Sequence, residues 1–155
     1  MHRRLFVIDS AAALAAAALA ACGGGSGDGG VTGPPIGYIP PPPNTMTPGV
    51  TTSGSTIVID LTVQTGLTNP NGFVLIPEAR AFVIHVGASD DYRAFTSVCT
   101  HEGCDVDNFS GGRIRCPCHG SQYDNNGAVV VGPAPSALRR FAATRSGNTL
   151  TITKS

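Results

Sequence analysis

The chain has 155 residues, a length that fits one folded domain with additional segments rather than two full cores. Ten lysines and arginines balance ten aspartates and glutamates, and the basic residues are scattered, which argues against nucleic acid as a partner. Twenty glycines, twelve prolines and the absence of tryptophan favour turns and short strands over a helical bundle.

Residues 1–21 have the layout of an export signal. His2, Arg3 and Arg4 give a positive start, and an alanine- and leucine-rich run follows over residues 11–21. The alternative is a membrane-spanning helix, but a span needs about 20 apolar residues and Asp9 interrupts this stretch. We therefore expect an exported protein.

Two short motifs refine this expectation. The sequence L-A-A-C at residues 19–22 resembles the lipobox of bacterial lipoproteins, in which the cysteine becomes the lipid-modified first residue. This resemblance implies that Cys22 is a lipid anchor. The sequence R-R-L-F-V at residues 3–7 resembles a twin-arginine motif, which directs export after folding. Both resemblances imply a location on the periplasmic side of a bacterial membrane.

Residues 22–55 form a predicted tether. The segment is rich in glycine and serine, then in proline at residues 40–43, and it has almost no apolar side chains to bury. On a lipid anchor, such a tether would let a domain sweep a volume near the membrane. A plain spacer is the simpler alternative.

We expect an all-β domain over residues 56–155. Short segments rich in β-branched and aromatic residues alternate with turn residues. These segments are 56–63, 72–76, 81–86, 92–98, 128–131 and 149–153. The sequence Asn125-Asn126-Gly127 before residue 128 is a turn signal that would close a hairpin. No stretch has a helical pattern of useful length.

Four of the five cysteines lie in two similar boxes. The first is C-T-H-E-G-C at residues 99–104, the second is C-P-C-H-G-S at residues 116–121, and a turn at Gly111-Gly112 separates them. Residues two or three apart in a tight loop can aim at one point. Two such loops side by side would supply two thiolates and two imidazoles to a metal site.

Alternative uses of these residues exist. Zinc accepts two cysteines and two histidines, but a zinc site leaves Cys104 and Cys118 unexplained although they occupy equivalent places in the two boxes. In an exported protein a disulfide can persist. A pure disulfide scaffold, with Cys99 and Cys116 as a second bridge, would leave both histidines without a role.

The boxes C-T-H-E-G-C and C-P-C-H-G-S-Q-Y resemble the two cluster-binding boxes of high-potential Rieske proteins of cytochrome bc and b6f complexes. The resemblance covers about residues 56–155 and is strongest over residues 99–138. It implies the Rieske fold, an antiparallel β-sandwich with a small inserted cluster-binding subdomain. It also implies one [2Fe-2S] cluster per chain.

The resemblance assigns a role to each matching residue. The implied ligands are Cys99 and Cys116 for the buried iron, and His101 and His119 for the exposed iron. Cys104 would pair with Cys118 in a disulfide. The implied proline loop, which packs over the cluster, is Gly132-Pro133-Ala134-Pro135.

Ser121 and Tyr123 match family positions whose hydroxyls bond to a bridging sulfide and to the ligand cysteine's sulfur. Imidazole ligation gives Rieske centres potentials of roughly −150 to +300 mV, against about −400 mV for plant-type ferredoxins. Hydroxyl donors stabilise the reduced state further. We therefore expect a potential near the upper end of the Rieske range. The alternative is that both hydroxyls are ordinary loop side chains.

Glu102 departs from the family pattern, because the residue after the first histidine is usually apolar in quinol-oxidising members. A carboxylate there disfavours entry into an apolar quinol pocket and favours a basic partner face. The stretch between His101 and Cys116 is also short for the family. The resemblance therefore does not predict the structure of the loop between the boxes.

These observations predict a lipid-tethered carrier that passes one electron at a time between a donor and a cytochrome. We expect a carrier rather than a self-contained enzyme, because the sequence shows no general base, nucleophile or substrate pocket. One alternative is the iron-sulfur subunit of a quinol to cytochrome c oxidoreductase, with quinol as a partner. Another is the small subunit of an arsenite-oxidase-like molybdenum enzyme.

Overall fold

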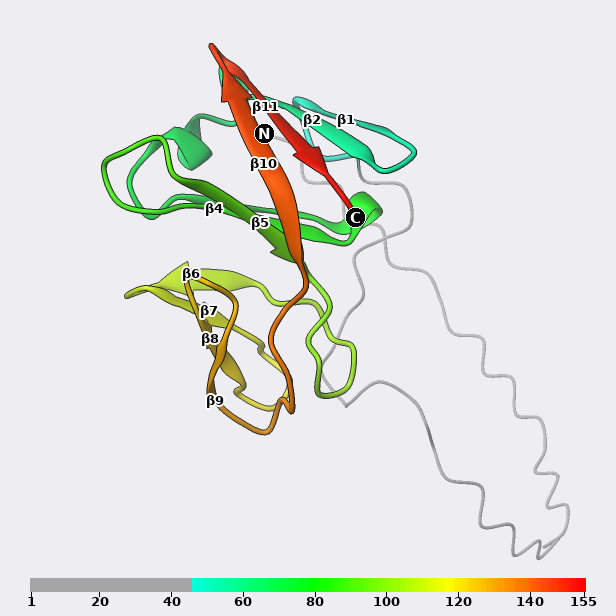
Figure 1. Ribbon diagram of the computed structural model, residues 1–155, viewed down its shortest axis with the longest axis vertical. Helices are drawn as coiled ribbons and strands as arrows, with labels where there is room; N and C mark the ends of the chain where they lie inside the picture. The colour runs from blue at the N-terminus through cyan, green and yellow to red at the C-terminus, as the bar shows by residue number, and fades with distance from the viewer. Residues whose placement is uncertain (1–45) are drawn as a thin grey trace, which may run out of the picture. The chain divides into compact units, whose positions relative to one another are not determined.

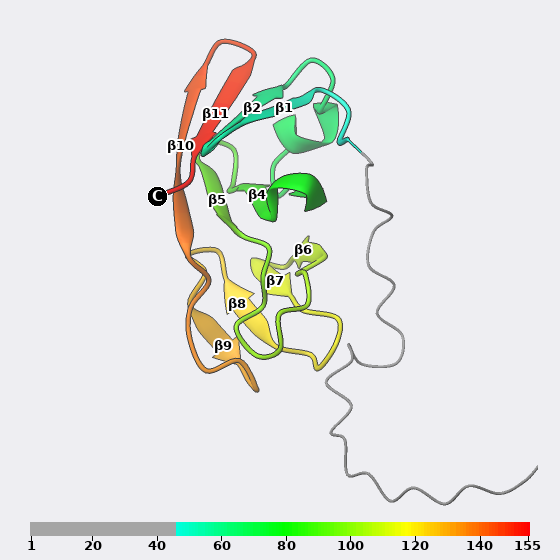
Figure 2. The same ribbon diagram turned by 90° about the vertical axis from the view of Figure 1, so that its right-hand side faces the viewer.

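The computed structural model describes residues 46–155, and over this range the all-β prediction is confirmed. Eleven strands and two short 3₁₀ helices, η1 (Thr65–Thr68) and η2 (Pro77–Ala79), form two antiparallel sheets and their connections in this range (Figures 1 and 2). The predicted export signal, Cys22 and most of the predicted tether lie outside the described residues. Within residues 46–155 no helix has the length and apolar character needed to cross a membrane.

The larger sheet has seven strands. In order across the sheet they are β1 (Val50–Ser53), β2 (Thr56–Asp60), β11 (Thr149–Thr153), β10 (Arg140–Ser146), β5 (Tyr92–Thr96), β4 (Ala81–His85) and β3 (Phe73–Ile76). Residues 142–146 of β10 pair with β11, and residues 140–141 pair with β5. This long strand therefore passes from one half of the sheet to the other (Figure 1). The two halves form the layers of the expected sandwich.

An apolar cluster, here called the sandwich core, fills the space between the two halves. Strand β2 alternates buried and less buried residues and contributes Ile57 and Ile59, and β11 contributes Leu150 and Ile152. The opposite half contributes Val83 among others. A period of two places all these side chains on the inward face of their strands.

Strand β4 is buried on both faces, and this double burial positions the smaller sheet. Ala81 and Val83 belong to the sandwich core, whereas Phe82 and Ile84 belong to a second cluster, here called the junction core. Successive side chains of a strand point to opposite faces, so one strand serves both cores. The junction core comprises Phe82, Ile84, Phe95, Cys99, Cys104, Val106, Phe109, Ile114, Cys116, Tyr123, Ala134 and Leu138.

The smaller sheet is the expected inserted subdomain. Its strands are β6 (Asn108–Ser110), β7 (Arg113–Arg115), β8 (Gln122–Asp124) and β9 (Val129–Val131), paired in that order between β5 and β10 in the chain. The predicted hairpin at residues 125–127 is confirmed, because it joins β8 to β9. Arg93 of β5 donates hydrogen bonds to the Asn125 carbonyl at 3.0 Å and to Asn126 Oδ1 at 2.8 Å, which ties this turn to the larger sheet.

The folded region begins earlier than the predicted boundary at residue 56. Residues 50–53 form β1, which pairs with β2 in register from Val50 opposite Ile59 to Ser53 opposite Thr56. The prediction that the tether extends to residue 55 is therefore wrong for its last residues. Val50 is buried in the sandwich core, and β2 supplies the hydrogen-bonding partner that a single stretch of sequence cannot reveal.

Several strand ends also differ from the prediction. Strand β2 stops at Asp60 rather than at residue 63, because the Asp60 carboxylate accepts hydrogen bonds from the Thr62 N–H at 2.8 Å and the Thr62 hydroxyl at 2.6 Å and closes a turn. Strand β5 stops at Thr96, before the first cysteine box. The short strands β6, β7 and β8, and the longer β10 with its exposed polar residues, were not predicted.

Substituting Gly127 by alanine tests the packing of the two sheets. Gly127 has φ of +83°, and an added Cβ would lie 2.8 Å from the Phe95 ring in the junction core. We expect Gly127→Ala to lower the free energy of unfolding by about 2–4 kcal/mol in urea titrations, from backbone strain and overpacking together.

Gly54→Ala is the matched control. Gly54 also has a positive φ, +55°, but an added Cβ meets nothing within 4 Å. In this variant the free energy of unfolding should fall only by the contribution of backbone strain, about 1–2 kcal/mol. Equal losses in the two variants would contradict the close contact between the hairpin and Phe95.

Candidate metal centre

The two cysteine boxes form two loops at the edge of the smaller sheet. The first loop leaves β5, and the second joins β7 to β8. Within the first, the Cys99 N–H donates to the Cys104 carbonyl at 2.7 Å and the Gly103 N–H donates to the Cys99 carbonyl at 3.0 Å. Within the second, the Cys116 N–H donates to the Ser121 carbonyl at 2.9 Å. Each loop is therefore closed by its own backbone.

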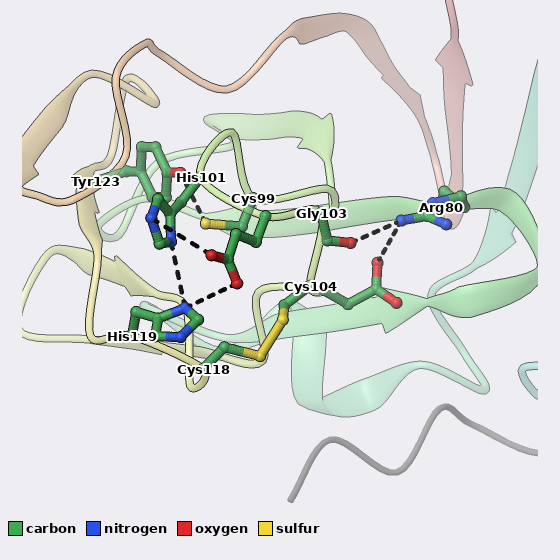
Figure 3. The surroundings of a disulfide bond; sticks show 10 residues. Arg80, Cys99, His101, Gly103, Cys104, Cys118, His119 and Tyr123 are labelled. Atoms are coloured by element: carbon green, nitrogen blue, oxygen red, sulfur yellow. Dashed lines mark hydrogen bonds and ion pairs between the residues drawn. A yellow bond between two sulfur atoms is a disulfide. The ribbon is translucent and has the colours of Figure 1, made fainter. Parts of the chain in front are cut away.

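A disulfide joins Cys104 of the first loop to Cys118 of the second. The pairing that the family resemblance implied is thus present in the structure, and it connects residues 14 positions apart (Figure 3). The bridge holds the two loops side by side. It also leaves the thiols of Cys99 and Cys116 free.

The four remaining donors divide into a buried pair and an exposed pair. Cys99 and Cys116 are each 2% exposed. The side chains of His101 and His119 are 27% and 35% exposed. The two histidine Nδ1 atoms lie 3.2 Å apart and the rings are nearly perpendicular, at 86° (Figure 3). The loops therefore place sulfur donors on the inside and nitrogen donors on the outside of one site.

The two buried thiols have different proton affinities. Burial, followed by its hydrogen bond with Cys99, raises the pKa of Cys116 to about 11. Burial also opposes ionisation of Cys99, but hydrogen bonds led by that of the Tyr123 hydroxyl outweigh it, so the pKa of Cys99 is lowered. A second thiolate beside the first requires a compensating positive charge, which a metal would supply.

Tyr123 is fully buried and connects the smaller sheet to the first loop. Its hydroxyl oxygen lies 3.2 Å from Cys99 Sγ and accepts a hydrogen bond from the Thr100 N–H at 3.1 Å. The Thr100 hydroxyl in turn donates to the Ser136 carbonyl at 2.6 Å. The sequence predicted Tyr123 but not Thr100 or Ser136, because nothing in their spacing marks them as partners.

Ser121 of the second loop contacts the segment 132–135. The Ser121 side chain is fully buried, and its Oγ accepts a hydrogen bond from the Ala134 N–H at 3.0 Å. Ala134 is itself buried in the junction core. The segment 132–135 therefore lies against the second box, and its packing over a cluster stays a prediction. Ser121 also hydrogen bonds to the Cys99 thiolate and contributes to its lowered pKa.

Glu102 lies between the two histidines at the exposed side. Its carboxylate oxygens are 3.6 Å from His119 Nδ1 and 3.9 Å from His101 Nε2, and the side chain is 51% exposed. His101, Glu102 and His119 each offer a potential ligand atom, and these atoms lie within 4.8 Å of one another. The residue that departs from the family pattern therefore sits at the tip of the site.

Arg80 supports the first loop from a distant part of the chain. It ends η2 with a φ of +45°, and its Nη2 donates to the Gly103 carbonyl at 3.1 Å (Figure 3). The same guanidinium lies 3.8 Å from Asp105. Sequence reasoning missed Arg80, since 23 positions separate it from Gly103 and no motif links them.

The donor set suits an iron-sulfur group with two unlike metal positions. Thiolates are the usual ligands of iron-sulfur clusters, and histidines replace two of them in Rieske centres. The separation of a buried sulfur pair from an exposed nitrogen pair matches two metals with different ligands, whereas a single ion would draw the four donors to one point.

Comparisons with known proteins give the same family. The family model of the Rieske [2Fe-2S] domain matches residues 63–142. The cytochrome b6-f complex iron-sulfur subunit of a Cyanothece species is 52% identical over 64 residues, 41% of this chain and 35% of that protein. Subunit 1 of the same name from a Nostoc species is 36% identical over 95 residues, 61% of this chain and 49% of that protein.

A solved structure is also similar. The plasma membrane Rieske protein PetC3 from Synechocystis PCC 6803 is 31% identical, with a TM-score of 0.49, over 61% of this chain and 92% of that chain. The chain spans between a third and a half of the length of the two cyanobacterial subunits above. The match of the family model over more than half of the chain shows that this protein belongs to the Rieske [2Fe-2S] family and binds one [2Fe-2S] cluster.

Proposed function

We propose that this protein is a lipid-tethered electron carrier on the outer face of a bacterial membrane, with a cytochrome as its electron acceptor. The observation that carries the proposal is the pair of facing loops, which present two histidines to solvent above two buried thiols. The bound cluster supplies reversible one-electron chemistry near the upper end of the biological range of such centres. The chain supplies the ligands, the hydrogen bonds and the docking surface.

Cys99 and Cys116 are the proposed ligands of the buried iron, and His101 and His119 those of the exposed iron. The burial of the thiols and the convergence of the histidine nitrogens support this division. A ligand histidine uses one ring nitrogen for the metal and can present the other to a partner. The partially exposed histidine edges are therefore the proposed point of approach for the redox partner.

Tyr123 and Ser121 are the proposed hydrogen-bond donors to the cluster environment. The Tyr123 hydroxyl accepts from the Thr100 N–H, and its own proton has two acceptors at 3.2 Å, Thr100 Oγ1 and Cys99 Sγ, of which we assign it to the sulfur. Donation to a sulfur ligand stabilises the state with more negative charge, which is the reduced one. Both residues are fully buried, so water does not compete with these bonds.

A second candidate function is that of an iron-sulfur subunit in a quinol to cytochrome c oxidoreductase. The names of the two cyanobacterial relatives favour it, since both are subunits of cytochrome b6-f complexes. Glu102 opposes it, because an ionised carboxylate between the histidines would have to leave water to enter an apolar quinol site. We therefore retain the carrier as the first proposal.

The proposed anchor, Cys22, and the proposed export signal at residues 1–21 rest on sequence motifs. A tether from residue 22 to about residue 49 would link the anchor to β1. Such a glycine- and proline-rich segment would give the domain a wide reach along the membrane. This reach suits a carrier that visits a donor and an acceptor in turn.

Iron and sulfide analysis of ligand variants tests the proposed ligands. Wild-type protein matured with iron should contain about two iron and two sulfide per chain. Cys116→Ser and His119→Gln should each lose most of both, because one iron then lacks a protein ligand. Cys22→Ser changes a cysteine outside the two boxes, keeps all four proposed ligands and the disulfide, and serves as the control. Full iron content in Cys116→Ser would rule out its role as a ligand.

Tyr123→Phe tests the proposed hydrogen bond to Cys99. Loss of one hydrogen bond worth about 0.5–1.5 kcal/mol should lower the reduction potential by roughly 20–65 mV, measured by redox titration. Tyr92→Phe is the matched control, because the Tyr92 hydroxyl is buried, has no hydrogen-bond partner within residues 46–155 and lies outside the site. A potential that is unchanged in Tyr123→Phe would show that this hydroxyl does not act on the cluster.

Cys22→Ala tests the proposed lipid anchor. In bacteria grown with a labelled fatty acid, we expect the full chain to carry label and to sediment with membranes. The Cys22→Ala variant should lose the label and appear in the soluble periplasmic fraction. If the variant stays with the membranes, the first 21 residues act as a spanning anchor instead.

A further inference from the structure

A groove opens beside the first cysteine box, on the side of Arg80. It has a volume of about 460 Å³ and is lined by residues from four separate segments of the chain. Its cationic side chains are Arg80, Arg139 and Lys154, and its apolar lining includes Val98 and Phe141. We call this feature the basic groove. No acidic residue of the described chain lines it.

Backbone hydrogen bonds fix the two arginines of the basic groove around the start of the first loop. The Thr96 N–H donates to the Arg139 carbonyl at 2.8 Å, and the Ser97 N–H donates to the Arg80 carbonyl at 3.0 Å. Consecutive residues of the segment that leads to Cys99 are therefore bound to the two arginine positions. The fold itself places two guanidinium groups beside this segment.

The charge of the basic groove is largely uncompensated within the described residues. The Arg139 guanidinium lies over the Phe141 ring at 5.3 Å and makes no hydrogen bond or ion pair with residues 46–155. Lys154 donates to the Ala79 carbonyl at 3.1 Å, which is a neutral acceptor. Arg80 alone has a carboxylate nearby, at 3.8 Å. At least two of the three cations can therefore bind an external anion.

We propose that the basic groove docks an acidic segment of the protein that exchanges electrons with this chain. This inference rests on the proposed function, because it identifies the partner's surface chemistry. The groove adjoins Thr100, which lies between two of the proposed cluster ligands. A segment bound there would hold the partner next to the histidine tip.

The shape of the groove favours a protein over a membrane surface. It is an open depression, and the partly exposed Val98 gives it an apolar wall that can contact the methylene groups of glutamate side chains, whereas Phe141 is buried beneath Arg139. A flat layer of anionic lipid headgroups offers no projection to fill it. Electron-transfer complexes have small interfaces, in which charge sets the encounter rate and orientation. The chain has a formal net charge of zero, so steering must come from local groups such as these.

The basic groove and the histidine tip carry charges of opposite sign, and this difference would orient the partner. Glu102 at the tip carries a negative charge and is 51% exposed, whereas the groove is positive. A partner with acidic residues opposite the groove and none opposite Glu102 binds in one orientation. The reversed orientation places like charges together, which is unfavourable.

Binding of a fluorescent poly-glutamate peptide to the cluster-loaded full chain tests the groove directly. At low ionic strength, Arg139→Gln and Lys154→Gln should each weaken binding by about two- to fivefold. Arg140→Gln is the matched control, since Arg140 is the exposed neighbour in sequence, removes the same charge and does not line the groove. Equal effects of Arg139→Gln and Arg140→Gln would overturn the proposal.

Two competing ligands complete the binding test. If Arg139→Gln leaves poly-glutamate binding unchanged but abolishes binding of inorganic phosphate, the groove is a small-anion site and the proposal fails. If it abolishes binding to phosphatidylglycerol vesicles instead, the groove faces a membrane and the proposal also fails. A loss confined to the peptide supports a protein partner.

Electron transfer to an acidic c-type cytochrome separates this inference from the proposed function. The rate constant for wild-type protein should fall as salt is added, and Arg139→Gln should lower it about two- to fivefold at low salt while Arg140→Gln should not. If wild-type transfers electrons and the two variants behave alike, only the groove proposal is wrong. If loaded wild-type transfers no electrons, the proposed function is wrong, and peptide binding still tests the groove.

Discussion

Burial of one central element on both faces underlies this architecture. Strand β4 packs against the sandwich core with Ala81 and Val83 and against the junction core with Phe82 and Ile84. The junction core contains the cysteine side chains themselves, so the loops that hold them cannot move without disturbing this packing. The site is thus built into the apolar interior on its sulfur side and opens to solvent only on its histidine side. A cluster held by these residues would be protected from water on its sulfur side and accessible on its histidine side.

Connections between the two boxes, and from the boxes to other segments, hold the loops in place. The Cys104–Cys118 disulfide links the loops to each other, and Tyr123 links the first loop to β8. Arg80 fastens the first loop to η2. Each of these contacts joins separate segments of the chain, the first by a covalent bond and the other two by hydrogen bonds. Preorganisation of this sort lets the chain hold ligands in position before and after electron transfer, with little rearrangement.

The sequence predicted the candidate ligands of the site better than the residues that hold its loops in place. The two boxes have a specific spacing, so the donors, Tyr123 and Ser121 could be named in advance, and the structure brings them together. Thr100, Ser136 and Arg80 could not be named, because their roles depend on contacts between distant segments. In the fold, strands with alternating apolar residues were predicted within a few residues. The strands β6, β7 and β8 were missed because three residues are too few to show an alternating pattern of apolar side chains. Strand β1 was missed because it depends on pairing with β2.

The central claim is that two buried thiols and two exposed histidines hold one [2Fe-2S] cluster that carries single electrons. Electron paramagnetic resonance of the dithionite-reduced full chain, matured with iron, tests it most directly. The account predicts a signal of the Rieske type, with mixed nitrogen and sulfur ligation, that disappears on reoxidation and returns on reduction. Protein that contains zinc in place of iron and gives no such signal would contradict the account.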